Sequence, residues 1–263
     1  MLSLSDIQVT FNPGTPLAKT ALLGIDLTIP MGQFVTVIGS NGAGKSTLLN
    51  VVSGDIRPNQ GRVLIDGQAV TGWSAARRAA MVARVFQNPL AGSCSDLTIE
   101  ENLVLALKRG HSRGLKPALN RRLREQFRAR LANLGLGLEN RLRDRMGLLS
   151  GGQRQAVSLV MATLAPTKIL LLDEHTAALD PKTAAFILTL TQTLVVEQQL
   201  TTLMVTHSMA QALDLGERTL MLHEGRIALD ITGAERANLQ VSDLLARFAS
   251  QKQAISDDAL LLG

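Results

Sequence analysis

The sequence predicts an α/β fold with a parallel-sheet core, an N-terminal antiparallel β subdomain and an inserted α-helical subdomain. Three observations lead to this prediction. Short apolar runs broken by glycine turns fill the chain up to residue 86, and apolar residues then recur at nearly every fourth position between residues 88 and 165. Two later apolar runs, 169–172 and 203–205, end in polar residues. With 46% hydrophobic residues, the 263-residue chain can bury a sizeable core.

The first 70 residues predict short strands joined by tight turns. Residues 2–11 and 25–29 alternate between apolar and polar side chains, as half-buried strands do. Asn12-Pro13-Gly14 has the composition of a turn, and residues 62–65 form a further short strand before Asp66-Gly67. These strands predict the antiparallel sheet beside the main parallel one.

The apolar run 34–38 precedes a glycine-rich stretch and a helix start, which is the context of a phosphate-binding loop. Glycines let backbone N–H groups turn toward phosphate oxygens, and the helix N-terminus adds further donors. Lys45 can bring its charge to the β- and γ-phosphates, and the Ser46 hydroxyl can bind Mg²⁺. A purely structural turn is the alternative, but every fixed position of the motif is filled. The sequence therefore predicts a P-loop NTPase core whose nucleotide-binding residues are Gly39, Ser40, Asn41, Gly42, Ala43, Gly44, Lys45, Ser46 and Thr47.

Residues 88–165 predict the helical subdomain. Thr98 with Glu101 and Ser150 with Gln153 have the spacing of capping boxes, so a helix is expected to begin after each cap. Between them runs an apolar stripe at helical spacing. Gly151 and Gly152 lie in the first turn of the second helix, where glycine is costly unless something such as a phosphate approaches the backbone closely. The stripe consists of Leu119, Leu123, Phe127, Leu131 and Leu134.

The last third of the chain continues the parallel sheet. Residues 169–172 form a buried strand that ends in Asp173-Glu174, and Asp180-Pro181 caps and begins another helix. Residues 203–205 form a strand that leads to His207. A closing hairpin at 220–229 follows, and the tail 233–263 contains one amphipathic segment, 242–248.

Composition restricts the class of protein. No uncharged apolar run reaches the ~18 residues of a membrane span, and the N-terminus lacks the basic and apolar regions of a signal peptide. The single cysteine, Cys94, suits a reducing cytoplasm. Residues 108–145 hold twelve Lys or Arg against three Asp or Glu, in a chain of net charge +5. This basic block can meet nucleic acid or an anionic membrane, or it can be a solvated helix face.

In this order the motifs resemble those of the ATP-binding-cassette (ABC) ATPases over essentially the whole chain. Residues 39–47 are similar to the Walker A motif, Leu149 to Gln153 match the family signature, and Ile169 to Glu174 are similar to Walker B. Three further positions fall where the family has its Q-loop, D-loop and switch histidine. These are Gln87, the segment Ala178-Leu179-Asp180, and His207.

The resemblance implies a single nucleotide-binding domain over residues 1–263, which works as a dimer of two copies with two ATP molecules between them. Ser150, Gly151, Gly152 and Gln153 of one copy, with Asp180, would then contact the ATP held by the other copy. Asp173 would hold Mg²⁺ together with Ser46 and Gln87. Glu174 would polarise the attacking water, and His207 would contact the γ-phosphate and orient that water. Gln87 would sense Mg²⁺ and water and report them to whatever docks on the helical subdomain.

Two positions depart from the family pattern. The family's adenine-stacking aromatic is commonly tyrosine, and this chain has none, so Phe11 at the end of the first strand is the expected replacement. Ordinary core packing of Phe11 is the alternative. His175 stands where the family often has proline. A structural role is expected for it, and a role in the subunit interface is the alternative.

The expected function is that of the ATP-hydrolysing subunit of an importer, bound as a peripheral protein at the cytoplasmic face of the cell membrane. Its partners would be a separate membrane permease and, through it, a solute-binding protein. The segments 11–15 and 173–180 resemble a bacterial branch linked to uptake of amino acids such as tryptophan or other aromatics. A soluble cassette ATPase acting on nucleic acid or the ribosome is the alternative. A regulator without turnover is disfavoured because Glu174 and His207 are both present, and no nucleic acid is expected as a partner.

Overall fold

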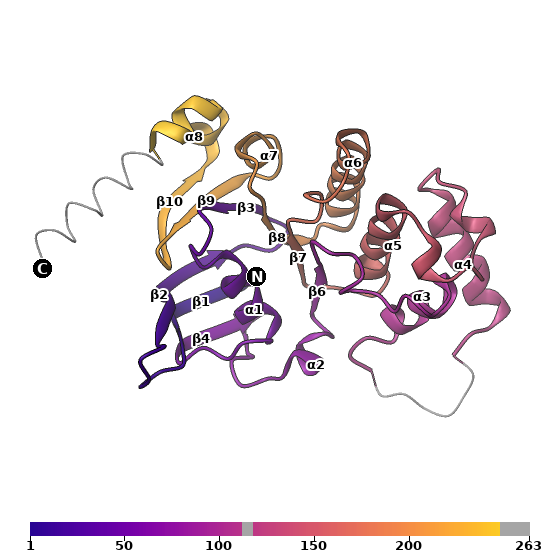
Figure 1. Cartoon of the computed structure of the whole chain (residues 1–263), viewed down its shortest axis with the longest axis horizontal. Coiled ribbons are helices and arrows are strands. Elements are labelled where there is room, and N and C mark those ends of the chain that lie inside the picture. The colour runs from indigo at the N-terminus through magenta and orange to yellow at the C-terminus, as the bar shows by residue number, and fades with distance from the viewer. Residues whose placement is uncertain (112–117, 248–263) are drawn as a thin grey trace, which may run out of the picture. The chain divides into compact units, whose positions relative to one another are not determined.

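The computed structural model describes residues 1–111 and 118–247, and these form two compact units (Figure 1). The first unit holds residues 1–52, 56–72 and 203–247, and the second holds residues 53–55 and 73–202. The last residue of the predicted amphipathic segment and the rest of the tail lie outside the described residues.

An antiparallel sheet makes up the N-terminal part of the first unit. Its strands follow the order β2-β1-β4-β5. The alternation in the first strand turns Leu2, Leu4, Ile7 and Val9 inward, and all four are buried. This sheet confirms the predicted antiparallel subdomain. The strands are β1 (Leu2–Phe11), β2 (Lys19–Ile29), β4 (Gln60–Ile65) and β5 (Gln68–Ala69).

The first unit also contains strands in the order β10-β9-β3-β8. Strand β3 (Phe34–Gly39) pairs in parallel with β9 (Arg218–His223), and it is buried on both faces because helices cover such sheets. The tight turn Glu224-Gly225 joins β9 to β10, as predicted. The remaining elements of this unit, some of whose end residues are assigned to the second unit, are α1 (Lys45–Ser53), β8 (Thr201–Val205), α7 (Met209–Asp214), β10 (Arg226–Thr232) and α8 (Gly233–Ala237).

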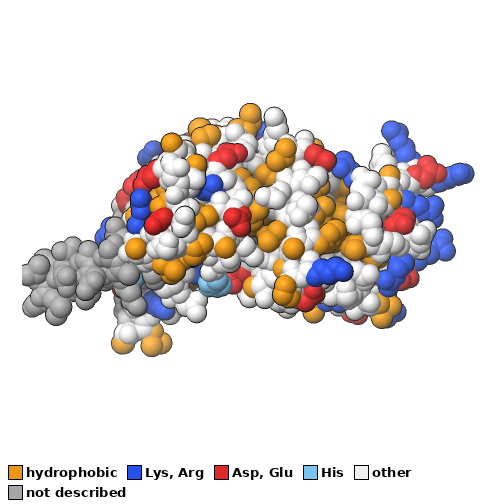
Figure 2. Space-filling model, turned by 90° about the horizontal axis from the view of Figure 1, so that it is seen from above, with side chains coloured by type: hydrophobic (Ala, Val, Ile, Leu, Met, Phe, Trp, Pro, Cys, Tyr) orange, Lys and Arg blue, Asp and Glu red, His pale blue; other side chains and the backbone are white. Residues whose placement is uncertain are grey.

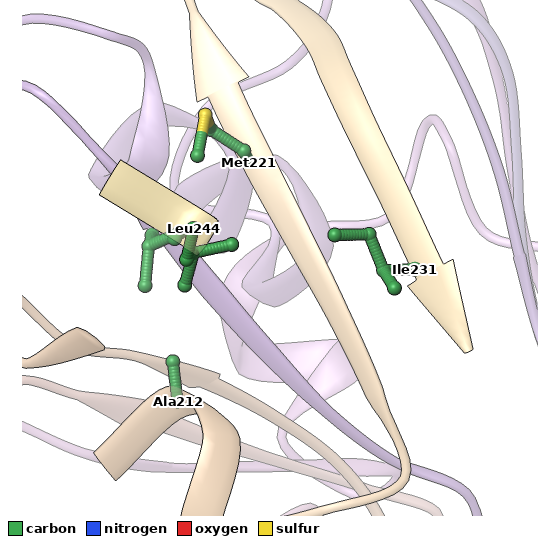
Figure 3. Packing of buried hydrophobic residues seen from close by; sticks show 5 residues of the cluster. Ala212, Met221, Ile231 and Leu244 are labelled. Atoms are coloured by element: carbon green, nitrogen blue, oxygen red, sulfur yellow. The ribbon is translucent and has the colours of Figure 1, made fainter. Parts of the chain in front are cut away.

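One core cluster of the first unit ties the tail to the sheet (Figure 3). Leu244, from the predicted amphipathic segment, is fully buried against Met221 of β9 and Ala212 of α7. Ile38 and Ile231 complete the cluster. Leu244 therefore anchors residues 242–247 within the first unit, whereas the neighbouring Leu245 is 50% exposed.

The second unit contains two parallel strands and most of the helices. Strand β6 (Val82–Val85) pairs in parallel with β7 (Ile169–Asp173), with Val85 opposite Leu172. The helices are α2 (Ala75–Arg78), α3 (Ile99–Leu107), α4 (Arg121–Ala132), α5 (Gly151–Thr163) and α6 (Pro181–Gln198), with short 3₁₀ turns at Leu138–Asn140 and Met146–Leu148.

The predicted helix caps are present in the second unit. Thr98 and Ser150 each form a complete capping box with the residue three positions later, and the Asp180 side chain accepts the Thr183 N–H at 3.1 Å. In the apolar stripe of α4, Phe127 and Leu131 are fully buried, whereas the stripe's N-terminal leucines are half-buried.

The parallel pairs, the antiparallel sheet and the covering helices confirm the predicted α/β fold with a P-loop NTPase core. Within the described ranges, we find no helix with the length and apolar character that crossing a membrane requires.

Candidate nucleotide site

The glycine loop has the backbone shape that a phosphate cradle requires. Gly44 lies at φ +103°, and a Cβ there would be 2.6 Å from the carbonyl oxygen of Ala21. Gly39 lies at φ +152°, and its Cβ would overlap the carbonyl of Leu222. Side chains rarely adopt these φ values, so glycine is needed at both positions. The hairpin turn supports the loop, because the Gly225 N–H donates to the Ala43 carbonyl at 3.1 Å.

Lys45 is held over this loop. Its side chain is buried, and its Nζ donates to the carbonyl oxygens of Gly39 at 2.8 Å and Ser40 at 2.9 Å. Asn41, Gly42 and Ser46 are exposed around it. The loop thus offers a fixed positive charge, N–H groups at the start of α1, and a hydroxyl, which together suit a polyphosphate with a bound cation.

His207 lies at the same edge of the sheet as the glycine loop. The Thr206 N–H donates to the Val37 carbonyl at 3.1 Å, which pairs the end of β8 with β3 just before the loop. His207 itself is exposed. Ligands of open α/β sheets collect at the carboxyl ends of parallel strands, so this position suits a group that meets bound nucleotide.

Phe11 ends β1 opposite Lys19 and is 39% exposed. The alternative of ordinary core packing is therefore wrong for Phe11. Its ring is available at the surface of the first unit, as a stacking residue must be.

The second unit holds the carboxylates. Asp173 is the last residue of β7, and Glu174 follows with φ +47°. Because Val85 pairs with Leu172, Gln87 and Glu174 both lie just beyond the carboxyl ends of neighbouring parallel strands. The predicted site residues therefore form two groups. Phe11, residues 39–47 and His207 belong to the first unit, and Gln87, residues 150–153, Asp173, Glu174 and Asp180 belong to the second.

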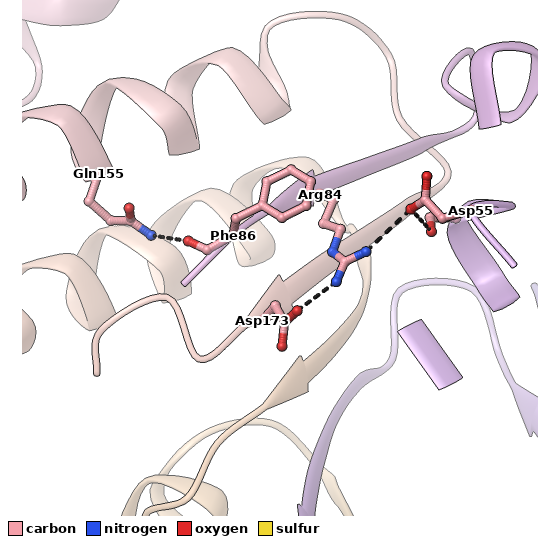
Figure 4. A network of polar contacts seen from close by, with 6 residues as sticks. Asp55, Arg84, Phe86, Gln155 and Asp173 are labelled. Carbon is pink, nitrogen blue, oxygen red and sulfur yellow. Dashed lines mark hydrogen bonds and ion pairs between the residues drawn. The ribbon is translucent and has the colours of Figure 1, made fainter. Parts of the chain in front are cut away.

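Figure 4 shows an arginine between two aspartates in the second unit. Arg84 of β6 donates from Nη2 to Asp173 Oδ2 at 2.6 Å and from Nη1 to Asp55 Oδ2 at 3.3 Å. Its guanidinium also lies over the Phe86 ring, 4.7 Å from the centroid. The side chains of Arg84 and Asp173 are 11% and 15% exposed. Asp173 thus has a positively charged neighbour on the adjacent strand.

Helix α5, which begins within the signature residues 149–153, contacts the segment that leads from β6 to Gln87 (Figure 4). Gln155 of α5 is buried and donates from Nε2 to the Phe86 carbonyl at 3.2 Å. The two signature glycines differ in their surroundings. Gly151 is exposed at the helix start, whereas a Cβ on Gly152 would overlap the Thr183 side chain of α6. Close packing against Thr183 therefore favours glycine at residue 152, beyond any need to approach a phosphate.

His175 is fully enclosed behind Glu174. It is 2% exposed, and its Nε2 lies 3.0 Å from the Thr191 hydroxyl of α6. Burial lowers the pKa of His175 to about 4, so the imidazole is neutral at neutral pH. The burial and hydrogen bond of His175 agree with the structural role expected for it.

Sequence reasoning missed Arg84, Gln155 and Thr191. The position of Arg84 inside an apolar strand indicates a buried ion pair, because a buried arginine needs a counter-charge from a neighbouring strand. Gln155 and Thr191 gave no such indication, since polar residues within helices are usually solvent-facing.

A groove of about 920 Å³ opens in the second unit beside the segment that follows Gln87. It has apolar walls and a basic edge. Its lining includes Val82, Val85, Leu105 and Met161, the basic Arg77 and Lys108, and the segment 91–94. Cys94 within that segment is exposed, and it is the chain's single cysteine.

Comparison with known proteins defines the class of this site. A model of the ABC transporter family matches residues 22–177, more than half of the chain. The chain is 44% identical to the tyrosine transport ATP-binding protein of Clostridioides difficile, over 94% of this chain and 98% of that protein. It is 36% identical to the thiamine import ATP-binding protein ThiQ of Escherichia coli, over 87% and 90%.

A solved structure supports the same family. A dimeric ATP-binding cassette in a post-hydrolysis state bound to ADP and Pi superposes with a TM-score of 0.76 at 29% identity, over 88% of this chain and 98% of that chain. This chain belongs to the ABC transporter family. It is an ATP-binding and ATP-hydrolysing cassette.

Proposed function

We propose that this cassette powers the import of a small solute through a separate membrane permease. The observation that carries the proposal is the groove beside the Gln87 segment in the second unit. Its apolar walls and basic edge suit an amphipathic helix with acidic groups near Arg77 and Lys108. A permease helix docked between residues 88–97 and α3 would respond to movement of the Gln87 segment. ATP binding and hydrolysis would thereby be coupled to the permease.

An amino acid is the proposed solute. A relative named for tyrosine transport, 44% identical over nearly the whole chain, supports an aromatic amino acid. The relatives named for thiamine import support a small solute more generally. A solute-binding protein would deliver the solute to the permease, and the cassette would work at the cytoplasmic face of the membrane.

In this proposal each group of residues has one task. The N–H groups and Lys45 of residues 39–47 bind the phosphates, and Phe11 stacks on the adenine. Glu174 accepts a proton from the attacking water, and His207 orients that water against the γ-phosphate. Ser150, Gly151, Gly152, Gln153 and Asp180 meet the nucleotide bound to a second copy of the chain. Mg²⁺, when bound by Ser46, Asp173 and Gln87, would neutralise phosphate charge.

The basic surface of the second unit is assigned to the membrane. Figure 2 shows Lys and Arg side chains gathered over the end of the second unit that carries α4. Arg124 is used internally, because it donates to Glu100 at 2.8 and 3.2 Å. Arg121, Arg122, Arg128 and Arg130 are exposed. Each basic residue near anionic headgroups contributes ~1 kcal/mol to the free energy of membrane binding. Action on nucleic acid or the ribosome is the second candidate, and the same charge favours it.

The native Cys94 tests the proposal directly. In membranes, a thiol cross-linker should join Cys94 to a multi-span protein, and Cys94→Ser should abolish the product. The matched control moves the thiol out of the groove by combining Cys94→Ser with Val196→Cys, because Val196 lies on α6 and is 75% exposed. Absence of the Cys94 product, together with nucleic acid retained through purification, would replace the import proposal with the second candidate.

A further inference from the structure

The backbone at Glu174 adopts a conformation that the surrounding structure must enforce. Its φ of +47° lies in the left-handed region, which costs a residue with a side chain ~1–2 kcal/mol. The chain turns immediately afterwards, with the Ala177 N–H donating to the Glu174 carbonyl at 3.0 Å. Strained positions of this kind persist only where neighbouring contacts hold them in place.

The next side chain provides such a contact. His175 and Thr191 are 2% and 0% exposed, and His175 Nε2 lies 3.0 Å from Thr191 Oγ1. The Thr191 hydroxyl donates its own proton to the Ile187 carbonyl at 2.8 Å. The hydroxyl oxygen is therefore the acceptor toward His175, and the imidazole carries its proton on Nε2. A two-bond chain thus runs from the residue after Glu174 into the backbone of α6.

We propose that His175 and Thr191 position the Glu174 carboxylate for hydrolysis by fixing the Glu174–His175 peptide on α6. Rotation of that peptide would break a hydrogen bond between two fully buried groups and leave the donor unsatisfied, which is costly. The backbone that carries the Glu174 side chain is therefore fixed before nucleotide binds. This inference rests on the proposed catalytic role of Glu174.

Thr191→Val tests the inference with little change in shape. Displacement of a reacting group by about 1 Å can cost ~100-fold in rate, so we expect kcat for ATP hydrolysis to fall at least ~10-fold. KM for ATP should change less than twofold, because the phosphate loop lies in the first unit and is untouched. Thr191→Ser keeps the hydroxyl and should restore kcat.

The chain offers a matched control on the same helix. Thr193 also donates to a carbonyl four residues earlier, Thr189, at 3.0 Å, but it is exposed. Thr193→Val makes the same chemical change and should leave kcat and KM unaltered. On the partner side, His175→Gln retains an N–H donor and should keep more activity than His175→Leu.

The outcomes separate this inference from the role of Glu174. If Thr191→Val keeps kcat within twofold, or if Thr191→Ser does not restore a lost kcat, the positioning role is wrong. If Glu174→Gln hydrolyses ATP normally, the catalytic role on which the inference rests has failed. Loss of activity in Glu174→Gln alone would contradict only the positioning role.

Discussion

Arg84 and Asp173 form an ion pair across neighbouring parallel strands, with Nη2 and Oδ2 separated by 2.6 Å. Removing one partner of a mostly buried pair leaves the other charge without compensation. We expect Arg84→Gln to lower the free energy of unfolding by roughly 3 kcal/mol, measured by urea denaturation. Arg121→Gln breaks an ion pair of α4 whose arginine is 95% exposed, and it should change nothing measurable. Equal effects of the two changes would mean that the Arg84 pair does not stabilise the fold.

Lys45→Ala should weaken nucleotide binding itself. A charge-assisted contact is worth ~1.5–3 kcal/mol, so the Kd of a fluorescent ATP analogue should rise about 10- to 100-fold. Lys19→Ala removes an exposed lysine of the same unit and is the control. An unchanged Kd in Lys45→Ala would remove Lys45 from the phosphate site.

Gly44→Ala should lower the stability of the fold and also weaken ATP binding. The new Cβ would lie 2.6 Å from the Ala21 carbonyl at a φ of +103°. The left-handed strain alone is ~1–2 kcal/mol, and it should appear as a lower Tm together with weaker ATP binding. Gly72→Ala places its Cβ in open space and should leave both unchanged. A wild-type Tm in Gly44→Ala would contradict the geometry of the loop.

Phe11→Ala should cost about 1–3 kcal/mol of ATP affinity if the ring stacks on adenine. Because Phe11 is 39% exposed, its loss should affect the fold little. Leu17→Ala, at a 78% exposed residue of the adjoining turn, controls for loss of apolar surface. Equal affinity in a folded Phe11→Ala protein would exclude stacking.

Much of the fold could be predicted because its signals are local. The caps at Thr98, Ser150 and Asp180 and the glycine loop each depend on residues a few positions apart, and all are present in the structure. Strand β2 was less predictable. It begins at Lys19, whereas the sequence predicted a strand only over residues 25–29. Residues 19–24 were not predicted because irregular pairing with β1 and Gly24 at φ +74° interrupt the alternation that marks a strand.

The site was predictable where motifs are contiguous and unpredictable where partners are far apart in sequence. Arg84 meets Asp173 only because β6 and β7 are adjacent, and Gln155 meets Phe86 only through packing of α5. His175 was visible as an unusual residue, but its partner Thr191 lies 16 residues further along the chain, on α6, and resembles any helical threonine. Such pairs follow from tertiary structure, not from periodicity.

Glu174→Gln gives the most direct test of the account. The change keeps the size of the side chain but removes the base, so ATP hydrolysis should fall ~10²–10⁴-fold while ATP binding is retained. The protein should then persist as an ATP-bound dimer, detected by light scattering after size-exclusion chromatography. Glu197→Gln, at an exposed glutamate of α6, should hydrolyse ATP like the wild type. Near-normal hydrolysis by Glu174→Gln would contradict the account.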